Sequence, residues 1–264
     1  MSTPSPKKKR ELLLGNYNVS VTNVQNFSNL QIEGSLFKVP RYHFENSSEV
    51  FHDMFLLPQG DSPEGSSDDH PIKLEGVLAY DFEQLLGTLY PGVAPSAETI
   101  DWKSVLKLAT LWRFLNIRKL AIQHLASKSN FDKMSAHEKL SLGQKYHVVE
   151  WVRRGYIQFI TRKKPLTVEE GENIGLSAAI RLFRLREKVW KKYMSKQLED
   201  DDCFTVAGSK PASTKRVRAA VNREFEEELK DAEFKARALL PEENRQKSTG
   251  SVRSNPPKIR HSSD

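Results

Sequence analysis

The stretch from Gln31 to Pro40 constrains the fold of this chain more than any other part of the sequence. Apolar residues there alternate with polar ones on either side of Glu33-Gly34, which is typical of a short hairpin. The apolar positions are Ile32, Leu36, Phe37 and Val39. Pro40 should end the second strand, because proline has no N–H to donate to a neighbouring strand. Beyond it, only Ile72-Lys73-Leu74 looks like a further short strand.

Helical periodicity dominates the rest of the first half, where apolar residues recur every three to four positions. Asp81 is expected to be an N-cap, with Gln84 completing a capping box. Another helix should start near Asp101 and end at Asn116, which would also cap the next one. The four expected apolar stripes are Val50, Phe51, Met54 and Phe55; Phe82, Leu85, Leu86 and Leu89; Val105, Leu108, Ala109, Trp112 and Leu115; and Ile117, Leu120, Ala121 and Leu125.

The second half has only helical periodicity. Ser135 with Glu138, and Thr167 with Glu170, have the spacing of capping boxes. The expected stripes are Leu140 and Leu142; Trp151, Val152, Tyr156, Phe159 and Ile160; Ile174, Ile180, Phe183 and Trp190; and Val217, Val221, Phe225, Leu229, Ala232, Ala236 and Leu239.

These patterns predict an α+β fold in which a short β-sheet flanked by α-helices is followed by an all-α extension and a disordered basic tail. Polar and Pro/Gly/Ser-rich stretches separate the predicted segments. The segments are a disordered basic N-terminus (1–15), an α/β domain (16–127), a helical extension (128–198), a linker (199–215), an amphipathic helix (216–241) and a disordered tail (242–264).

Composition favours a protein of a reducing compartment. The 264 residues include one cysteine, Cys203, which cannot form an intramolecular disulfide or a multi-cysteine zinc site. No apolar run reaches the roughly 20 residues that span a bilayer, and the N-terminus does not resemble a signal peptide. We therefore expect an intracellular protein of the cytoplasm, the nucleus or both, without a membrane partner.

The net charge of +7 raises the question of nucleic-acid binding. The basic residues are spread along the chain without finger spacing or an RNA-binding aromatic signature, which favours solvated helix faces over a nucleic-acid partner. One compact cluster, Lys7, Lys8, Lys9 and Arg10, has the form of a nuclear import signal. A solvated basic tail is the alternative interpretation.

No catalytic, cofactor or metal site is expected. Ser104 and Lys107 match a Ser-x-x-Lys nucleophile pattern, but its partner motifs are missing and the residues between them belong to a helix stripe. The histidines are scattered without metal-ligand spacing, and Cys203 lies among acidic residues that would raise the pKa of its thiol. These absences favour a binding protein over an enzyme.

The order of elements resembles the BTB/POZ domain over residues 28–127. The motifs that carry the resemblance are Ile32 to Pro40, Ser48 to Phe55, Ile72 to Leu74, Asp81 to Tyr90, Val105 to Ala109 and Ile117 to Leu125. The resemblance is nearest to the BTB set of mushroom-forming fungi, whose helical extension is similar to Leu142 to Tyr146 and Glu150 to Leu166. It implies a protein–protein interaction module that forms a homodimer or a hetero-oligomer, with protein partners and no catalysis.

Two departures from the family pattern bear on function. Pro40 stands where many animal members have a histidine, so the charged pocket of transcriptional members does not carry over. The hydrophobic-x-Glu element of cullin-binding members is reduced to Ser96-Ala97-Glu98. A substrate adaptor of a cullin-type ubiquitin ligase and a nuclear transcriptional regulator stay open as alternatives.

Self-association needs an exposed surface, and the sequence suggests one candidate. Val19, Val21 and Val24 alternate within Asn18 to Val24 and could form an added dimer strand at the sheet edge. The aromatic residues are expected mainly in the core, and any that lie at an interface should come from one group. That group is Phe27, Phe44, Phe51, Trp102, Trp112, Trp151 and Trp190.

Overall fold

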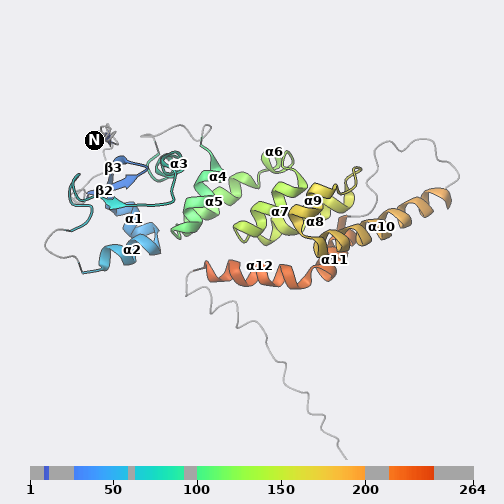
Figure 1. The fold of residues 1–264 in the computed structure, drawn as a ribbon. Helices are drawn as coiled ribbons and strands as arrows, with labels where there is room; N and C mark the ends of the chain where they lie inside the picture. The colour runs from blue at the N-terminus through green and yellow to red at the C-terminus, as the bar shows by residue number, and fades with distance from the viewer. Residues whose placement is uncertain (1–8, 12–26, 59–62, 92–99, 200–213, 241–264) are drawn as a thin grey trace, which may run out of the picture. The chain divides into compact units, whose positions relative to one another are not determined.

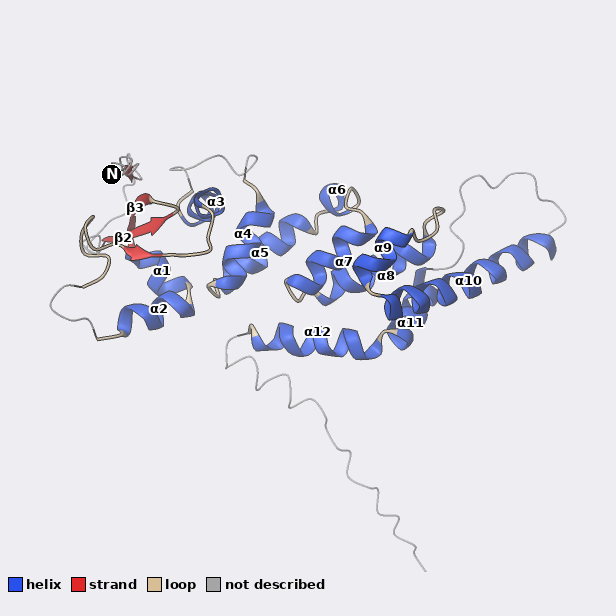
Figure 2. Ribbon diagram, in the orientation of Figure 1, coloured by secondary structure: helices blue, strands red, loops and turns tan. Residues whose placement is uncertain are grey.

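The computed structural model of this chain describes residues 9–11, 27–58, 63–91, 100–199 and 214–240, with the backbone alone described at 9–11, 192–199 and 214. The chain divides into two compact units, residues 1–134 and 135–264, and each is described by itself. Figure 1 shows the order of the elements, and Figure 2 shows that strands occur only in the first unit among the described residues.

The first unit combines a small sheet with six helices in its described residues. Its strands are β1 (Lys9–Glu11), β2 (Phe27–Ile32), β3 (Ser35–Pro40) and β4 (Ile72–Lys73). Its helices are α1 (Arg41–Ser47), α2 (Glu49–Leu56), α3 (Ala79–Leu89), α4 (Trp102–Leu111), α5 (Leu115–Leu125) and α6 (Lys128–Phe131). The second unit contains α7 (Ala136–Lys145), α8 (Val149–Thr161), α9 (Val168–Ile174), α10 (Leu176–Glu199), α11 (Thr214–Glu224) and α12 (Glu226–Ala238).

The predicted hairpin is confirmed. β2 and β3 pair in antiparallel register from Phe27↔Pro40 to Ile32↔Ser35, which leaves a two-residue turn. Glu33 and Gly34 both have positive φ, 48° and 76°, as the tightest hairpin turns require. The strand ends at Pro40 as expected, and α1 begins at the next residue. Helix α1 itself was not predicted.

The sheet has the order β1-β3-β2-β4, with β1 parallel to β3 and β4 parallel to β2. β1 lies inside the stretch that we predicted to be disordered, residues 1–15. One face of the hairpin joins an aromatic cluster, in which Phe37 contacts Phe82 edge-to-face at a ring distance of 5.1 Å. The aromatic cluster consists of Phe37, Phe44, Phe51, Phe82, Trp112 and Phe114.

The prediction that Asp81 caps α3 is wrong. The helix begins at Ala79, so Asp81 lies within its first turn and is only 5% exposed. Its carboxylate accepts a hydrogen bond from Ser104 Oγ at 2.5 Å and forms an ion pair with Lys107 Nζ at 2.6 Å. Gln84, the second residue of the expected box, accepts a hydrogen bond from the Asp101 N–H at 3.0 Å. Both side chains therefore join α3 to α4, a role that local spacing does not reveal.

The junction between α4 and α5 also differs from the prediction. α4 ends at Leu111 instead of Asn116, and α5 begins at Leu115. Arg113 between them adopts a left-handed backbone (φ 55°), which turns both Trp112 and Phe114 into the aromatic cluster. Burial of these two rings determines where the helix breaks.

The core of the second unit forms around α8, whose predicted stripe is buried throughout. α7 lies very close to α8 because Gly143 has no side chain. A Cβ at Gly143 would lie 2.6 Å from the Val152 nitrogen. The buried cluster consists of Ala136, Leu140, Val152, Tyr156, Phe159, Ile160, Leu182, Leu185, Val217, Val221, Phe225 and Leu229.

The capping box at the start of α9 is confirmed. Thr167 Oγ1 accepts a hydrogen bond from the Glu170 N–H, and the Glu170 carboxylate accepts one from the Thr167 N–H. Arg162 donates to both oxygens of the same carboxylate and thereby holds the pKa of Glu170 down at about 2. At the equivalent position of α7, the Ser135 side chain accepts from the Glu138 N–H.

The helix that follows does not present the face that we predicted. Gly175, with φ 91°, separates α9 from α10 and changes the direction of the chain. In α10 the core is contacted by Leu182 and Leu185, whereas Ile180 and Phe183 are exposed. The prediction of Ile180 and Phe183 as a buried stripe is therefore wrong. It treated residues on both sides of Gly175 as one continuous helix, whereas they belong to two helices.

The last predicted helix is two helices. α11 and α12 meet at Phe225, which is fully buried and stacks on Tyr156 at a ring distance of 4.0 Å. The expected apolar positions from Val217 to Ala232 do face the core. The break follows because Phe225 leaves helical geometry, with φ −116° and ψ 32°, where it packs against α8.

One arginine caps the C-terminus of α8. Arg186 directs its guanidinium at the carbonyl oxygens of Phe159 (3.1 Å), Ile160 (3.0 Å), Arg162 and Lys163 (2.8 Å). The final carbonyls of a helix have no hydrogen-bond partner within it. A cation near them also interacts favourably with the partial negative charge at the C-terminal end of the helix dipole. Arg186 therefore joins α10 to the end of α8.

Substitution of Arg186 by Met should lower the free energy of unfolding by about 2 kcal/mol. The reason is that the carbonyl groups at the end of α8 lose their charged hydrogen-bond donor. Chemical denaturation of the full chain measures the change. Arg237→Met on the exposed side of α12 is the matched control, with an expected change within about 0.5 kcal/mol. Equal losses in the two variants would contradict the capping role.

Glu170 should make stability depend on pH. Its folded pKa of about 2 is below the unfolded value near 4.3. Its stabilising effect is therefore present at neutral pH and is lost as the pH falls from about 4.5 toward 2. Glu170→Gln should destabilise the protein by roughly 1 kcal/mol at pH 7, since the pair is partly solvent-exposed. Urea unfolding should show the two proteins converging near pH 2. A constant difference at all pH values would refute this.

Asp81→Ala should lower the free energy of unfolding by about 2 kcal/mol, less than for a fully buried pair because Lys107 can regain water. Asp53→Ala, at an exposed position of α2, is the control and should change it by less than about 0.5 kcal/mol. Urea denaturation followed by circular dichroism gives both values. A loss no larger than that of the control would show that the α3–α4 contact is dispensable.

Candidate interaction surfaces

The outer edge of β3 is the first candidate surface. Lys9, Arg10 and Glu11 pair in parallel with Leu36, Phe37 and Lys38. The opposite side of the sheet is closed differently: β4 pairs with β2, and the Asn29 N–H donates to the Gly65 carbonyl at 2.9 Å. An exposed strand edge invites pairing with another chain, so a short added strand is the usual means of covering it. Of the two edges, the β3 edge is the one covered by a strand from the N-terminal segment.

Some of the predicted site residues lie within the described residues and others lie outside them. Lys9 and Arg10 of the basic cluster lie in β1, while Lys7 and Lys8 lie outside the described residues. Val19, Val21 and Val24, the predicted dimer strand, also lie outside them. The strand that the structure does describe on the β3 edge therefore overlaps the basic cluster, which was predicted to lie in a disordered N-terminus (1–15) and to serve as a possible nuclear import signal.

Exposed apolar side chains on α1 and α2 form the second candidate, here called the α1–α2 surface. It consists of Tyr42, Val50, Leu56 and Leu57, with 60%, 38%, 70% and 63% of their area exposed. Tyr42, Leu56 and Leu57 were not among the predicted interface residues. The sequence did offer one indication that the two leucines are exposed. They follow the last buried residue of the stripe, Phe51, and come directly before Pro58.

The aromatic residues considered for an interface are now separated. Phe44, Phe51, Trp112 and Trp151 are buried in the cores. Phe27, by contrast, is 36% exposed on β2, with Lys38 Nζ 5.4 Å from its ring centre. Trp102 is half-buried and stacks on His124, and Trp190 donates from Nε1 to the Ile160 carbonyl at 3.0 Å. Phe27 is therefore the most accessible of the group.

Polar contacts fix α1 beside the sheet. The Tyr90 hydroxyl donates to the Pro40 carbonyl at 2.7 Å, and burial raises the pKa of Tyr90. His43 packs edge-to-face against the Tyr90 ring, and burial lowers the pKa of that imidazole. Glu49 pairs with Arg113 at 2.8 Å at the start of α2. The two helices that carry the α1–α2 surface are thus fixed by contacts with Tyr90 and Arg113.

The residues of the Ser-x-x-Lys pattern are occupied structurally. Ser104 and Lys107 both contact Asp81, and Val105 and Leu106 between them are fully buried in α4. Ser104 Oγ also lies 3.0 Å from Asp101 Oδ2. Lys107 is paired with a carboxylate rather than placed as a base toward the hydroxyl, so the arrangement links two helices.

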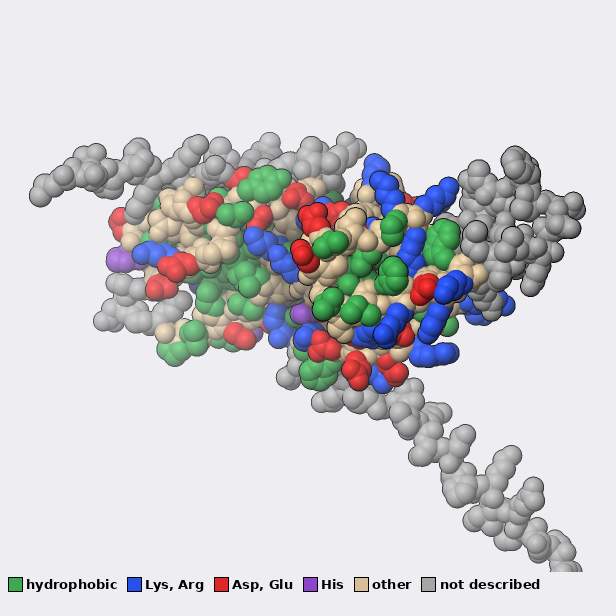
Figure 3. All heavy atoms as spheres, turned by 45° about the vertical axis from the view of Figure 1, so that its right-hand side comes forward, with side chains coloured by type: hydrophobic (Ala, Val, Ile, Leu, Met, Phe, Trp, Pro, Cys, Tyr) green, Lys and Arg blue, Asp and Glu red, His purple; other side chains and the backbone are tan. Residues whose placement is uncertain are grey.

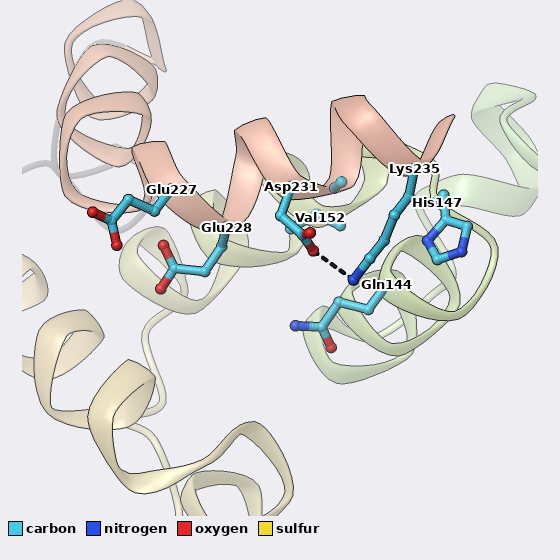
Figure 4. Close-up of a pocket in the computed structure, with 8 residues that line it drawn as sticks. Gln144, His147, Val152, Glu227, Glu228, Asp231 and Lys235 are labelled. Carbon is cyan, nitrogen blue, oxygen red and sulfur yellow. Dashed lines mark hydrogen bonds and ion pairs between the residues drawn. The ribbon is translucent and has the colours of Figure 1, made fainter. Parts of the chain in front are cut away.

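The second unit has a cleft between α12 and the α7–α8 pair (Figure 4). It has a volume of about 530 Å³ and is lined by Gln144, His147, Val152, Glu227, Glu228, Asp231, Ala232 and Lys235. Asp231 accepts from Lys235 at 2.7 Å, and Glu228 is paired with Arg181. None of these lining residues is a serine, threonine or cysteine, and the carboxylates of Asp231 and Glu228 are held in ion pairs with basic side chains.

The described residues hold no group of three or more His, Cys, Asp or Glu side chains placed to bind a metal ion. None of the helices within them is both long and apolar enough to cross a membrane. Cys203 lies outside the described residues.

Comparison with known proteins finds a family that matches part of the first unit. The family model of the BTB/POZ domain matches residues 28–129. Neither the curated proteins nor the solved structures contain a match. The matched residues run from β2 to the start of α6, so they include strands β2 to β4 and helices α1 to α5 and exclude β1. The chain therefore carries a BTB/POZ domain, a protein–protein interaction module, followed by a helical region.

Proposed function

We propose that this chain is a non-catalytic scaffold that self-associates through its BTB/POZ module and recruits protein partners to it. The observation that carries the proposal is the covering of β3 by β1, a strand of only three residues from outside the matched domain. Such a short strand contributes few hydrogen bonds. It can be replaced by the same strand of another copy without a change in the bonds formed.

The chain between β1 and the domain is long enough for such an exchange. Residues 12–26 separate β1 from β2, and an extended chain of that length reaches about 50 Å. Exchange of a short element between identical copies is a common route to dimers. A homodimer built in this way would contain two identical β1–β3 pairings.

The α1–α2 surface supplies the apolar component of the proposed interface. Leu56 and Leu57 are mostly exposed at the end of α2, while Phe51 of the same helix anchors it in the core. Clusters of exposed large apolar side chains mark interaction sites more often than isolated ones do. We assign this surface either to the second copy or to a recruited protein.

The basic cluster links the proposed assembly to localisation. We propose an intracellular protein in which Lys7 to Arg10 can be read by a nuclear import receptor as an extended basic segment. Lys9 and Arg10 are already extended in β1, so pairing with β3 and receptor binding would compete. Import would then favour chains whose β1 has left the sheet.

Removal of residues 1–25 should halve the molar mass of the protein at low micromolar concentration, because the strand that covers β3 is lost. Light scattering coupled to size exclusion gives the mass, and circular dichroism checks that the helices persist. Removal of residues 242–264 is the control at the other terminus and should leave the mass of the assembly near that of the full chain. An unchanged oligomer after removal of residues 1–25 would reject strand exchange.

A further inference from the structure

A second apolar surface lies in the helical region, here called the α9–α10 stripe. It consists of Val168, Leu176, Ile180 and Phe183, with 80%, 76%, 44% and 57% of their area exposed. Leu176, Ile180 and Phe183 follow one another at four and three residues and therefore share one face of α10. Figure 3 turns this part of the molecule forward and shows hydrophobic side chains exposed among Lys and Arg.

The stripe is not the core-facing side of its helix. Leu182 and Leu185 contact the buried cluster, and Ala179 is 9% exposed. Three large apolar side chains on one face of a helix, Leu176, Ile180 and Phe183, exceed the scattered single residues that monomers normally expose. The stripe therefore has the character of an interface.

The two sides of the stripe carry opposite charges. Gly171 packs against Ala179, which places α9 and its exposed Glu169 and Glu172 along one side of α10. Successive residues of a helix are about 100° apart, so Arg184 and Lys188 lie on the other side. We call these the acidic flank (Glu169, Glu172) and the basic flank (Arg184, Lys188).

The flanking side chains are available for pairing. Their neighbours Glu170 and Glu187 are paired with Arg162 and Lys191. Among the described residues, no ion pair or side-chain hydrogen bond is formed by Glu169, Glu172, Arg184 or Lys188.

This pattern is self-complementary. A twofold rotation about an axis along α10 places the stripe of one copy on the stripe of the other. It also sets each acidic flank opposite the basic flank of the partner, as an isologous contact requires. A uniformly acidic or basic partner would meet a flank of its own sign, and like charges at an interface are unfavourable. We propose that a second copy of this chain docks on the α9–α10 stripe.

The proposed contact is separate from the β1–β3 edge, since every residue that forms it belongs to the second unit. Its small size predicts weak association, which becomes populated only at high protein concentration. A chain with both contacts forms assemblies larger than a dimer when it is concentrated.

The test compares Phe183→Asp with Phe234→Asp in the full chain at several hundred micromolar. Phe234 is 73% exposed on α12, outside the stripe, so both variants place a charge at an exposed aromatic position. Light scattering should show a mass about twofold lower for Phe183→Asp, and no change for Phe234→Asp. An equal mass for wild type and Phe183→Asp would overturn the proposal. At low micromolar concentration Phe183→Asp should keep the wild-type mass, which separates this contact from strand exchange.

Reversal of the flanks gives an independent test. Arg184→Glu with Lys188→Glu makes both flanks acidic, and Glu169→Lys with Glu172→Lys makes both basic. Each double variant alone should lose the high-concentration mass, whereas an equimolar mixture of the two should recover it. Thermal unfolding near that of the wild type establishes that each is folded. A mixture that associates no better than its components would overturn the proposed pairing of flanks.

Discussion

The aromatic cluster of the first unit is the contact on which the rest of that unit depends. It brings the hairpin, α1, α2, α3 and the α4–α5 junction into one core through rings that touch edge-to-face. A sheet of short strands has too little apolar surface to be stable alone, so the helices must supply it. Because the large rings point inward, the apolar residues Leu56 and Leu57 at the end of α2 are left on the outside. Formation of the core and exposure of the α1–α2 surface are therefore two results of one packing arrangement.

Much of the fold could be predicted because its signals are local. The hairpin required only Glu33-Gly34 between two short apolar runs, and the α9 capping box required only Thr167 and Glu170. Helix α8 shows the same, since all five positions of its expected stripe are buried. In each case the residues that decide the structure lie within about ten positions of one another in the sequence.

The failures have other causes, which are either a partner distant in sequence or a turn whose effect the apolar spacing does not show. Asp81 was read as a cap, but Ser104 and Lys107 of another helix fix its position. Ile180 and Phe183 have the spacing of a buried stripe, yet a single turn at Gly175 rotates that stripe toward solvent. Phe225 likewise divides the last helix because Tyr156 lies beneath it. For the interaction surfaces, the sequence showed which residues are apolar but not which of them the core would leave uncovered.

The pairing of β1 with β3 also has a consequence for biosynthesis. β1 is translated before the strand that it pairs with, and β3 must first form its hairpin with β2. Contacts between neighbouring residues form faster than contacts between distant ones, so the hairpin is expected to precede β1 docking. During that interval on the ribosome, the open edge of β3 is equally accessible to the leading segment of an adjacent nascent chain. The timing of synthesis, as well as the stability of the finished sheet, would then determine whether each chain closes its own edge.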